Sequence, residues 1–258
     1  MSSDAARSTD AILADVRALH LMWKRGALGG AVMPEDVRPD LDKGSEELAR
    51  YFTLGMTLNY QRDSYALWRA CTATYRDTAT AWVFDPLAVS AAAETDLRAA
   101  LLRHKVALQP NRHPDIWRRN GEGLLRHSGG DVSRLFADQG HDIARMKGFL
   151  EANRSSFPYL SGPKISNYWL YVLSQYLTWP LTNRSALSVA PDTHVIAASR
   201  RLGLLAEGEA EGARLVLRVA ELWRDLTAGS EFAPIDLHTP LWLWSRGGFV
   251  AIEHLKEG

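Results

Sequence analysis

Apolar residues recur every three or four positions along almost the whole chain. Leu48, Phe52 and Met56 follow this spacing, and Leu215 and Val219 repeat it further on. This is the period of one face of an α-helix, whereas a half-buried strand alternates every second residue. The sequence has no convincing run of strict alternation and no Asn-Gly hairpin signal. The pattern therefore predicts an all-α protein with about nine or ten helices.

Glycine, proline and capping residues divide these helical windows. Gly29-Gly30 and the segment 33–39 separate an N-terminal helix from the next, and Gly129-Gly130-Asp131 ends one helix and starts another. Glycine tolerates the left-handed position after a helix, and aspartate accepts hydrogen bonds from the free N–H groups at a helix start. Tyr168 and Trp169 fall on the apolar stripe of a later window, so we expect both in the core.

Length and composition describe an ordinary globular protein. The chain has 258 residues, of which 46% are hydrophobic and 23% charged, enough for one large domain or two intimate lobes. Cys71 is the one cysteine, which excludes a disulfide framework, a zinc cluster of cysteines and a four-cysteine iron–sulfur site. Residues 1–10 are polar and lack the apolar core of a signal peptide, and no apolar run reaches the roughly 18 residues of a membrane span. We therefore expect a cytoplasmic protein without membrane contact and with a flexible segment 1–10.

The charge balance does not by itself indicate a nucleic-acid ligand. The chain has 30 basic and 30 acidic residues and a formal net charge of zero, whereas phosphate binding depends on lysine and arginine. The distribution of charge matters more than its sum. Basic residues gather at Arg118-Arg119, Arg126-His127 and Arg200-Arg201. Each pair is either part of a binding surface or an ordinary solvated helix face.

The first motif with candidate chemistry is Leu160-Ser-Gly-Pro-Lys164. A glycine in a tight turn between two helices leaves backbone N–H groups that can hold a phosphate oxygen, and proline suits the first helical position. Lys164 then lies in the first turn, where the positive end of the helix dipole disfavours its charge. That suits a nucleophile, because only a neutral amine attacks carbon. The spacing alone is equally consistent with an exposed lysine beside an ordinary turn.

The second motif is Pro191-Asp192-Thr-His-Val195. Proline before an aspartate, followed by an amphipathic stretch, is typical of a helix N-cap. The carboxylate of Asp192 either serves only as that cap or also faces a cleft and stabilises positive charge that develops on a sugar.

Together, the two motifs resemble the helix-hairpin-helix DNA glycosylase superfamily, the relatives of endonuclease III and 8-oxoguanine glycosylase. Ser161-Gly-Pro-Lys-Ile-Ser-Asn167 is similar to the hairpin, and Asp192-Thr-His-Val195 with Arg201-Leu-Gly-Leu204 is similar to the segment that follows it. Two weaker similarities support this. Leu58-Asn-Tyr-Gln61 resembles the family's early Leu-x-x-Gln stretch, which reaches into the duplex beside the extruded base, and the segment 236–246 resembles the family's last helix. The resemblance covers roughly 46–248, and only its central block is specific.

The resemblance implies a two-lobed helical fold with a helix-hairpin-helix near 150–177. The central lobe would comprise about 64–177, and the second lobe about 11–60 together with 180–258. The active cleft would lie between the lobes, and the target nucleotide would be flipped into it from the duplex.

The resemblance also implies a base-excision-repair enzyme, active as a monomer on double-stranded DNA with a damaged base, for example an oxidised purine such as 8-oxoguanine. Lys164 would attack the sugar C1′ and form a Schiff base that permits β-elimination, which is AP lyase activity. Asp192 would stabilise the transition state and help to activate Lys164. The residues implied for DNA contact are Gln61, Ser161, Gly162, Pro163 and His194. Tyr171 and Trp179 are the candidates for the base pocket.

The chain departs from the family pattern in three ways. The interval from Lys164 to Asp192 is longer than in compact members, which indicates an inserted loop around 179–188. The hairpin carries one extra residue within Tyr159–Ser161, and the iron–sulfur loop of endonuclease III is absent. We therefore expect no metal site formed by side chains and no cofactor; the resemblance leaves room for a monovalent cation on the hairpin carbonyls, on which the side chains give no information.

Three other functions remain open at this stage. An N-glycosidase for a free modified nucleoside or nucleotide would explain the neutral charge, but such a hydrolase needs no Schiff base. A non-catalytic helix-hairpin-helix DNA-binding protein would not need both Lys164 and Asp192. Without the resemblance, the sequence indicates a soluble α-helical protein, for example one that serves as a partner-binding scaffold.

Overall fold

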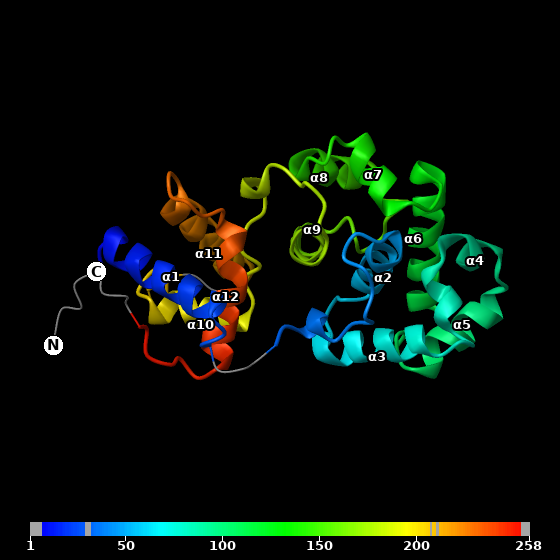
Figure 1. Ribbon diagram of the computed structural model, residues 1–258, viewed down its shortest axis with the longest axis horizontal. Coiled ribbons are helices and arrows are strands. Elements are labelled where there is room, and N and C mark those ends of the chain that lie inside the picture. Colours follow the sequence, from blue (N-terminus) through cyan, green and yellow to red (C-terminus); the bar gives the residue numbers. More distant parts are fainter. Residues whose placement is uncertain (1–6, 29–31, 207, 210–211, 254–258) are drawn as a thin grey trace. The chain divides into compact units, whose positions relative to one another are not determined.

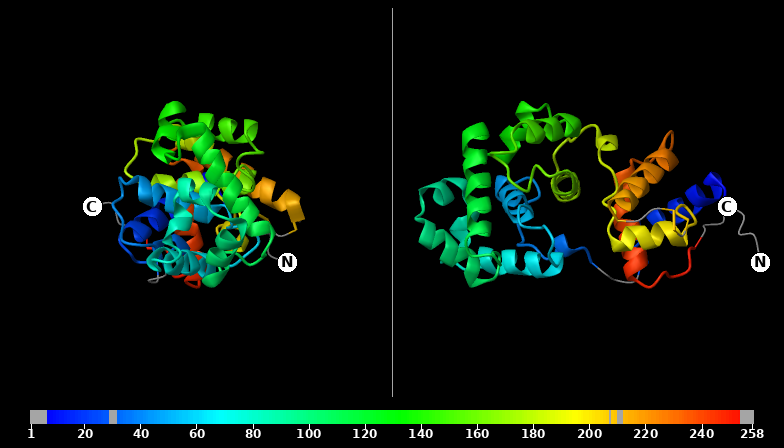
Figure 2. Two further views of the ribbon diagram at one scale, coloured as in Figure 1. Left: turned by 90° about the vertical axis from the view of Figure 1, so that its right-hand side faces the viewer. Right: turned by 180° about the vertical axis from the view of Figure 1, so that it is seen from behind.

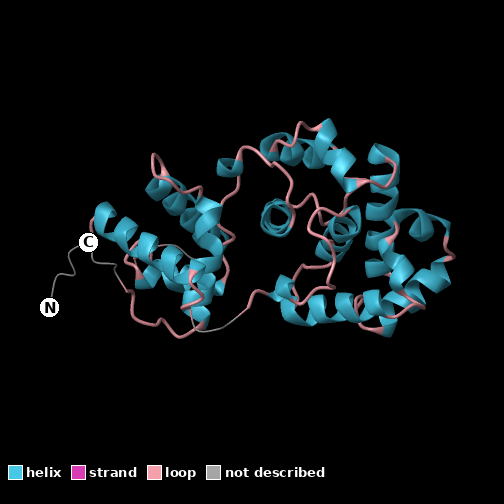
Figure 3. Ribbon diagram, in the orientation of Figure 1, coloured by secondary structure: helices cyan, strands magenta, loops and turns pink. Residues whose placement is uncertain are grey.

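The computed structural model describes residues 7–28, 32–206, 208–209 and 212–253. These residues form twelve α-helices, four short 3₁₀ helices and no β-strand (Figure 3). The all-α prediction is confirmed, but the expected number of helices was too low. The shortest helices, α4 (Pro86–Ala91) and α7 (Val132–Asp138), have 6 and 7 residues. That is fewer than two turns, too short to show a helical period in the sequence.

The chain divides into two compact units, each described here by itself. Unit 1 comprises Met1–Met33 and Leu187–Gly258, and unit 2 is Pro34–Ala186. The remaining α-helices of unit 2 are α2 (Glu46–Met56), α3 (Ser64–Arg76), α5 (Glu94–Arg103), α6 (Arg112–Ser128), α8 (Ile143–Ala152) and α9 (Pro163–Tyr176) (Figure 1). Those of unit 1 are α1 (Thr9–Lys24), α10 (Thr193–Arg201), α11 (Gly212–Thr227) and α12 (His238–Arg246).

The core of unit 2 forms around α2, whose residues from Leu48 to Met56 are buried except Arg50, and which packs against α9, α7, α3 and α6. Three fully buried tryptophans surround it, and each indole N–H has an acceptor. Trp68 donates to Glu35 at 2.9 Å, Trp117 to the Val83 carbonyl at 2.8 Å, and Trp169 to the Thr53 hydroxyl at 3.1 Å. Burial of such rings supplies much of the stability of a helical core, provided that their polar atoms are satisfied.

Two ends of unit 2 can be followed in Figure 1 and in the right-hand view of Figure 2. Helix α3 lies at one end and α7 at the other, and α6 runs between them (Figures 1 and 2). The start of α6 therefore lies near α3 and α5, and its C-terminal end lies near α7, with which it packs.

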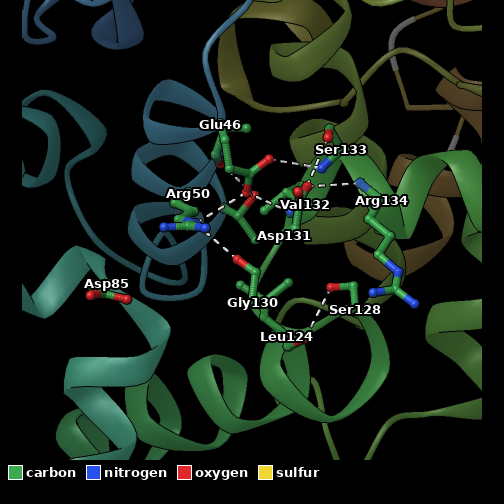
Figure 4. Close-up of polar contacts among 12 residues, drawn as sticks. Glu46, Arg50, Asp85, Leu124, Ser128, Gly130, Asp131, Val132, Ser133 and Arg134 are labelled. Atoms are coloured by element: carbon green, nitrogen blue, oxygen red, sulfur yellow. Dashed lines mark hydrogen bonds and ion pairs between the residues drawn. The ribbon is translucent and has the colours of Figure 1, made fainter.

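A pair of carboxylates joins α2 to α7 (Figure 4). Asp131 caps α7 by accepting from the Arg134 N–H at 2.9 Å. Glu46 accepts from the Val132 N–H at 2.6 Å and the Ser133 N–H at 2.9 Å. Burial raises the pKa of Glu46 to about 7, against the two backbone hydrogen bonds that lower it. The start of α7 is thus held by its own cap and by a side chain of another helix.

Unit 1 packs α12 against α10 and α1. Its core includes Val16, Val195, Leu202 and the fully buried Trp223, whose indole N–H donates to the Ser199 hydroxyl at 2.8 Å. No helix in the described ranges combines the length and apolarity needed to cross a membrane.

The unit boundaries differ from the lobes expected from the sequence. The segment 34–60, expected with the second lobe, belongs to unit 2, because the buried faces of α2 pack on α9 and α7. The segment 180–186 also belongs to unit 2. Of the expected flexible segment 1–10, the first six residues lie outside the described residues, whereas Thr9 and Asp10 already form the first turn of α1.

Candidate functional site

Helices α8 and α9 are joined by a ten-residue turn, 153–162, at the place predicted for the hairpin. The turn folds on itself through backbone hydrogen bonds. Ser156 N–H donates to the Asn153 carbonyl at 2.9 Å, and Ser161 N–H to the Phe157 carbonyl at 3.0 Å. Tyr159 has a φ of 64°, which is unusual for a residue other than glycine and reverses the chain direction here.

Helix α6 holds the turn from outside. The Arg119 guanidinium donates to the Ser155 carbonyl at 2.8 Å, and the Asn120 amide to the Pro158 carbonyl at 2.9 Å. Gly123 lets the two backbones approach, because a Cβ at this position would lie 2.5 Å from the Ser156 carbonyl oxygen. The position of the hairpin is therefore determined by residues of α6 that lie about 30 to 40 positions earlier in the chain.

Helix α9 starts without a capping side chain. Gly162 is its N-cap and Pro163 its first residue. The Gly162 N–H donates to the Tyr159 carbonyl at 2.9 Å, so this N–H is used inside the turn and does not point outward as expected. A Cβ at Gly162 would lie 3.1 Å from that carbonyl, which favours glycine there. The N–H groups of Lys164 and Ile165 have no partner among the described residues, as is usual for the first turn of an uncapped helix.

The side chain of Lys164 is exposed. It forms no ion pair or hydrogen bond with any described residue. It lies in the first turn of α9, where the helix dipole disfavours a positive charge. Nothing within unit 2 thus compensates its charge or restrains its four-carbon stem, an arrangement suited to an amine that reaches a ligand.

Asp192 is the N-cap of α10, as predicted. One carboxylate oxygen, Oδ1, accepts from the N–H groups of His194 and Val195, both at 3.0 Å. The other, Oδ2, accepts from the indole N–H of Trp242 on α12 at 2.9 Å. Asp192 is half-buried. Both oxygens are oriented by the protein before any ligand binds.

The residues around Asp192 form a compact polar and aromatic cluster in unit 1. The ring of His194 meets the edge of Trp242 with centroids 4.9 Å apart, and its Nδ1 lies 3.2 Å from the Ser245 hydroxyl. The Arg246 guanidinium stacks over Trp242 at 5.1 Å. A cation over the indole face polarises the ring and strengthens its N–H as a donor to Asp192.

The other residues expected at the site lie in different environments. Gln61 is exposed and has a φ of 51°, a left-handed backbone conformation in the loop after α2. Ser161 is buried, with 8% of its surface exposed. Tyr171 is 3% exposed and lies beside Tyr168, with ring centroids 5.9 Å apart. Trp179 is half-buried against Phe136.

Sequence reasoning assigned no role to the aromatic pair at the tip of the hairpin. Tyr60, 46% exposed, meets Tyr159 with ring centroids 5.2 Å apart. The Arg112 guanidinium lies 5.2 Å from the Tyr159 ring centroid. The pair brings the loop after α2 next to the hairpin turn. No local sequence pattern predicts a contact between residues a hundred positions apart. The motif Leu58-Asn-Tyr-Gln61 was the one signal in the sequence that this loop has a role.

The possible cation on the hairpin carbonyls stays a prediction, because a carbonyl oxygen that accepts one hydrogen bond keeps a second lone pair. The carbonyls of Phe157, Pro158 and Tyr159 already accept hydrogen bonds from within the protein. The described residues also contain no cluster of three or more histidine, cysteine, aspartate or glutamate side chains that could bind a metal ion.

Lys164 belongs to unit 2 and Asp192 to unit 1, and the geometry of each is that of its own unit. A scan against protein-family models finds no match, and a search of curated proteins finds no sequence match.

Proposed function

We propose that this protein is a base-excision DNA glycosylase with lyase activity, in which Lys164 is the nucleophile. The observation that carries the proposal is the start of α9. An exposed lysine without a partner in unit 2 occupies the first turn of a helix that follows a hairpin and opens on Gly162-Pro163. A structural lysine gains little at such a position, because the helix dipole opposes its charge.

The neutral amine of Lys164 attacks C1′ of a nucleotide flipped out of the duplex. A bond forms between Nζ and C1′ while the N-glycosidic bond breaks, and its electron pair leaves with the base, which takes up a proton. The sugar ring then opens: the C1′–O4′ bond breaks, O4′ takes up a proton, and Nζ loses one to give a Schiff base. Loss of a proton from C2′ expels the 3′ phosphate by β-elimination, and water releases Lys164.

Asp192 stabilises the positive charge that develops on the sugar as the base departs. Its carboxylate is held by two backbone N–H groups and by the indole of Trp242, so it needs little rearrangement when that charge appears. The reaction requires Asp192 and Lys164 to act on the same sugar. The damaged base is an oxidised purine in this proposal, and 8-oxoguanine is the first lesion to test.

Borohydride trapping tests the proposal. The protein is incubated with duplexes that contain 8-oxoguanine, an oxidised pyrimidine, an alkylated purine or an abasic site, and sodium borohydride reduces any Schiff base to a stable conjugate. We expect a conjugate with at least one lesion and with the abasic site, lost in Lys164→Gln and retained in Lys43→Gln. Lys43 is a matched control, because it is also an exposed lysine of unit 2. No conjugate with any substrate, or an equal amount from Lys164→Gln, would contradict the proposal.

The zero net charge of the chain favours one alternative, an N-glycosidase for a free nucleoside or nucleotide. The same trapping experiment distinguishes it. Release of a base from 8-oxo-dGMP without a trapped conjugate, together with no activity on any duplex, would support the alternative and exclude the lyase.

A further inference from the structure

An open pocket of about 410 Å³ lies on unit 2 between α3 and the C-terminal end of α5. Its lining combines alanines of α3 with polar residues of α3 and of the loops before α3 and after α5. The lining residues are Arg62, Asp63, Ala66, Arg69, Ala70, Ala73, His104, Lys105 and Leu108. The small alanine side chains leave room for a ligand to approach α3 closely.

The rim of this pocket carries uncompensated positive charge. Arg69 and Lys105 are exposed and form no ion pair with a described residue. Asp63 is the one carboxylate in the lining, and its Oδ1 already accepts from the Ala66 N–H at 2.6 Å as the cap of α3. The α3 segment itself, Ser64–Arg76, contains no acidic residue. The pocket therefore attracts an anion.

Arg62 adds a partly buried cation to the same pocket. Its terminal nitrogens donate to the carbonyls of Val106 at 2.7 Å and Lys105 at 3.1 Å, which are neutral acceptors. Its Nε is buried and has no hydrogen-bond partner among the described residues. The charge of Arg62 is thus positioned by carbonyls. The Asp63 carboxylate acts on this charge through space but forms no ion pair with it, so an anion in the pocket would add to the compensation for the water that Arg62 loses.

Lys105 adopts a backbone conformation that favours glycine. It follows His104, the C-cap of α5, and has a φ of 64°. Glycine is the usual residue at this left-handed position after a helix, because it has no Cβ. A lysine here is unfavourable for the fold, yet it places an ammonium group at the rim of the pocket. A strained backbone conformation at a charged residue is typical of a functional site, where the charge contributes to binding.

We propose that this pocket binds a phosphate ester, and that the ligand is the backbone of the DNA strand that also contacts the hairpin. The inference rests on the proposed function for the source of the phosphate. The loop 57–63 carries both Tyr60, which meets Tyr159 of the hairpin turn, and Arg62 of the pocket. One loop therefore links the two surfaces within unit 2, and a strand that crosses the hairpin has a basic pocket beside it.

The test uses the double variant Arg69→Gln/Lys105→Gly and two probes: a fluorescein-labelled undamaged duplex, followed by anisotropy from 50 to 200 mM KCl, and dGMP, followed by calorimetry. Two lost phosphate contacts should weaken duplex binding roughly tenfold or more at 0.1 M salt, and lower the slope of log K against log [salt] by about 2. Lys105→Gly also removes the left-handed lysine. We therefore expect the melting temperature of the double variant to be no lower than that of the wild type.

The matched control is Arg134→Gln, an exposed arginine of α7 at the opposite end of unit 2 (Figures 1 and 4). A weaker dGMP signal with an unchanged duplex slope would assign the pocket to a free nucleotide phosphate instead of a strand. Unchanged binding of both probes, or an equal loss in Arg134→Gln, would overturn the inference. Failure of the proposed function is separate: the wild type would then give no borohydride conjugate, while the charge variants would still change the duplex slope.

Discussion

Helices α9 and α10 begin in opposite ways, although each carries one of the two residues of the proposed reaction. Helix α9 opens on Gly162, which offers no capping side chain. The turn before it is held by α6, and Glu35 accepts from Tyr168 of α9 at 3.1 Å. Helix α10 opens on Asp192, which satisfies the first N–H groups itself. The start of α9 thus depends on neighbouring segments and leaves the side chain of Lys164 unrestrained. The start of α10 is capped by its own Asp192, whose carboxylate is held in place by hydrogen bonds.

This difference suits the chemistry assigned to each residue. A nucleophile must move toward carbon as the bond forms, and Lys164 has no partner in unit 2 to give up. A group that stabilises developing charge is most effective when it is already in position. The comparison predicts that changes near α9 act through distant packing, and that changes at α10 act through local hydrogen bonds.

The largest expected effect is on the pH dependence of unit 2. Glu35 accepts from the Trp68 indole and from the Tyr168 hydroxyl of α9, and burial raises its pKa to about 7. A raised carboxyl pKa stabilises the fold fully below the pKa of the unfolded chain, near 4.5, and this contribution is lost as pH rises through about 7. Relative to Glu35→Gln, the wild type should lose about 3 kcal/mol of unfolding free energy between pH 4.5 and 8.

Denaturant unfolding of both proteins at several pH values measures this difference. Subtracting the variant removes the contribution of Glu46, which titrates in the same range. A difference between the two proteins that does not change with pH would contradict the proposed support of α9 by a buried carboxyl group.

The next effect concerns the turn that leads into α9. Gly123→Ala places a Cβ 2.5 Å from the Ser156 carbonyl, so the hairpin turn must move away from α6. Overpacking of this kind typically costs about 1–3 kcal/mol. Gly148→Ala on α8 is the matched control, because a Cβ there meets nothing within 4 Å. Thermal unfolding should show a clear loss for Gly123→Ala and none for the control; equal stability of the two variants would show that α6 does not fix the turn.

At α10 the expected effect on stability is smaller and local. Asp192→Ala removes the cap and should cost about 1 kcal/mol, whereas Asp192→Asn, which keeps an acceptor oxygen, should cost less. Both variants lose the carboxylate charge, so both should slow single-turnover base release by a similar, large factor. If the rate of base release fell only in proportion to the loss of stability, so that Asp192→Asn released the base almost as fast as the wild type, Asp192 would be only a helix cap.

Trp242→Phe keeps an aromatic ring but removes the N–H donated to Asp192, so we expect an effect on stability comparable to that of Asp192→Ala. Loss of one such bond costs roughly 0.5–1.5 kcal/mol. As a positioning residue, Trp242 should affect the rate of base release and leave the affinity for an undamaged duplex unchanged. A parallel loss of both quantities would point to a structural role.

The sequence predicted the features that repeat or that lie close together in the chain. The helical class, the helix after Gly162, the N-cap at Asp192 and the buried Trp169 follow from periodicity and capping rules. Contacts that join distant positions could not be predicted. Trp242 lies 50 residues from Asp192, and Tyr159 lies a hundred from Tyr60. The membership of α2 in unit 2 likewise depends on which apolar faces meet, not on the pattern of one segment.

Peptide mapping of the borohydride conjugate shows whether Lys164 is the nucleophile. The trapped protein–DNA conjugate is digested with nuclease and protease, and the site of the added sugar is read by mass spectrometry. The account predicts the modification at Nζ of Lys164. A conjugate mapped to the N-terminal amine or to any other lysine, with Lys164 unmodified, would contradict it.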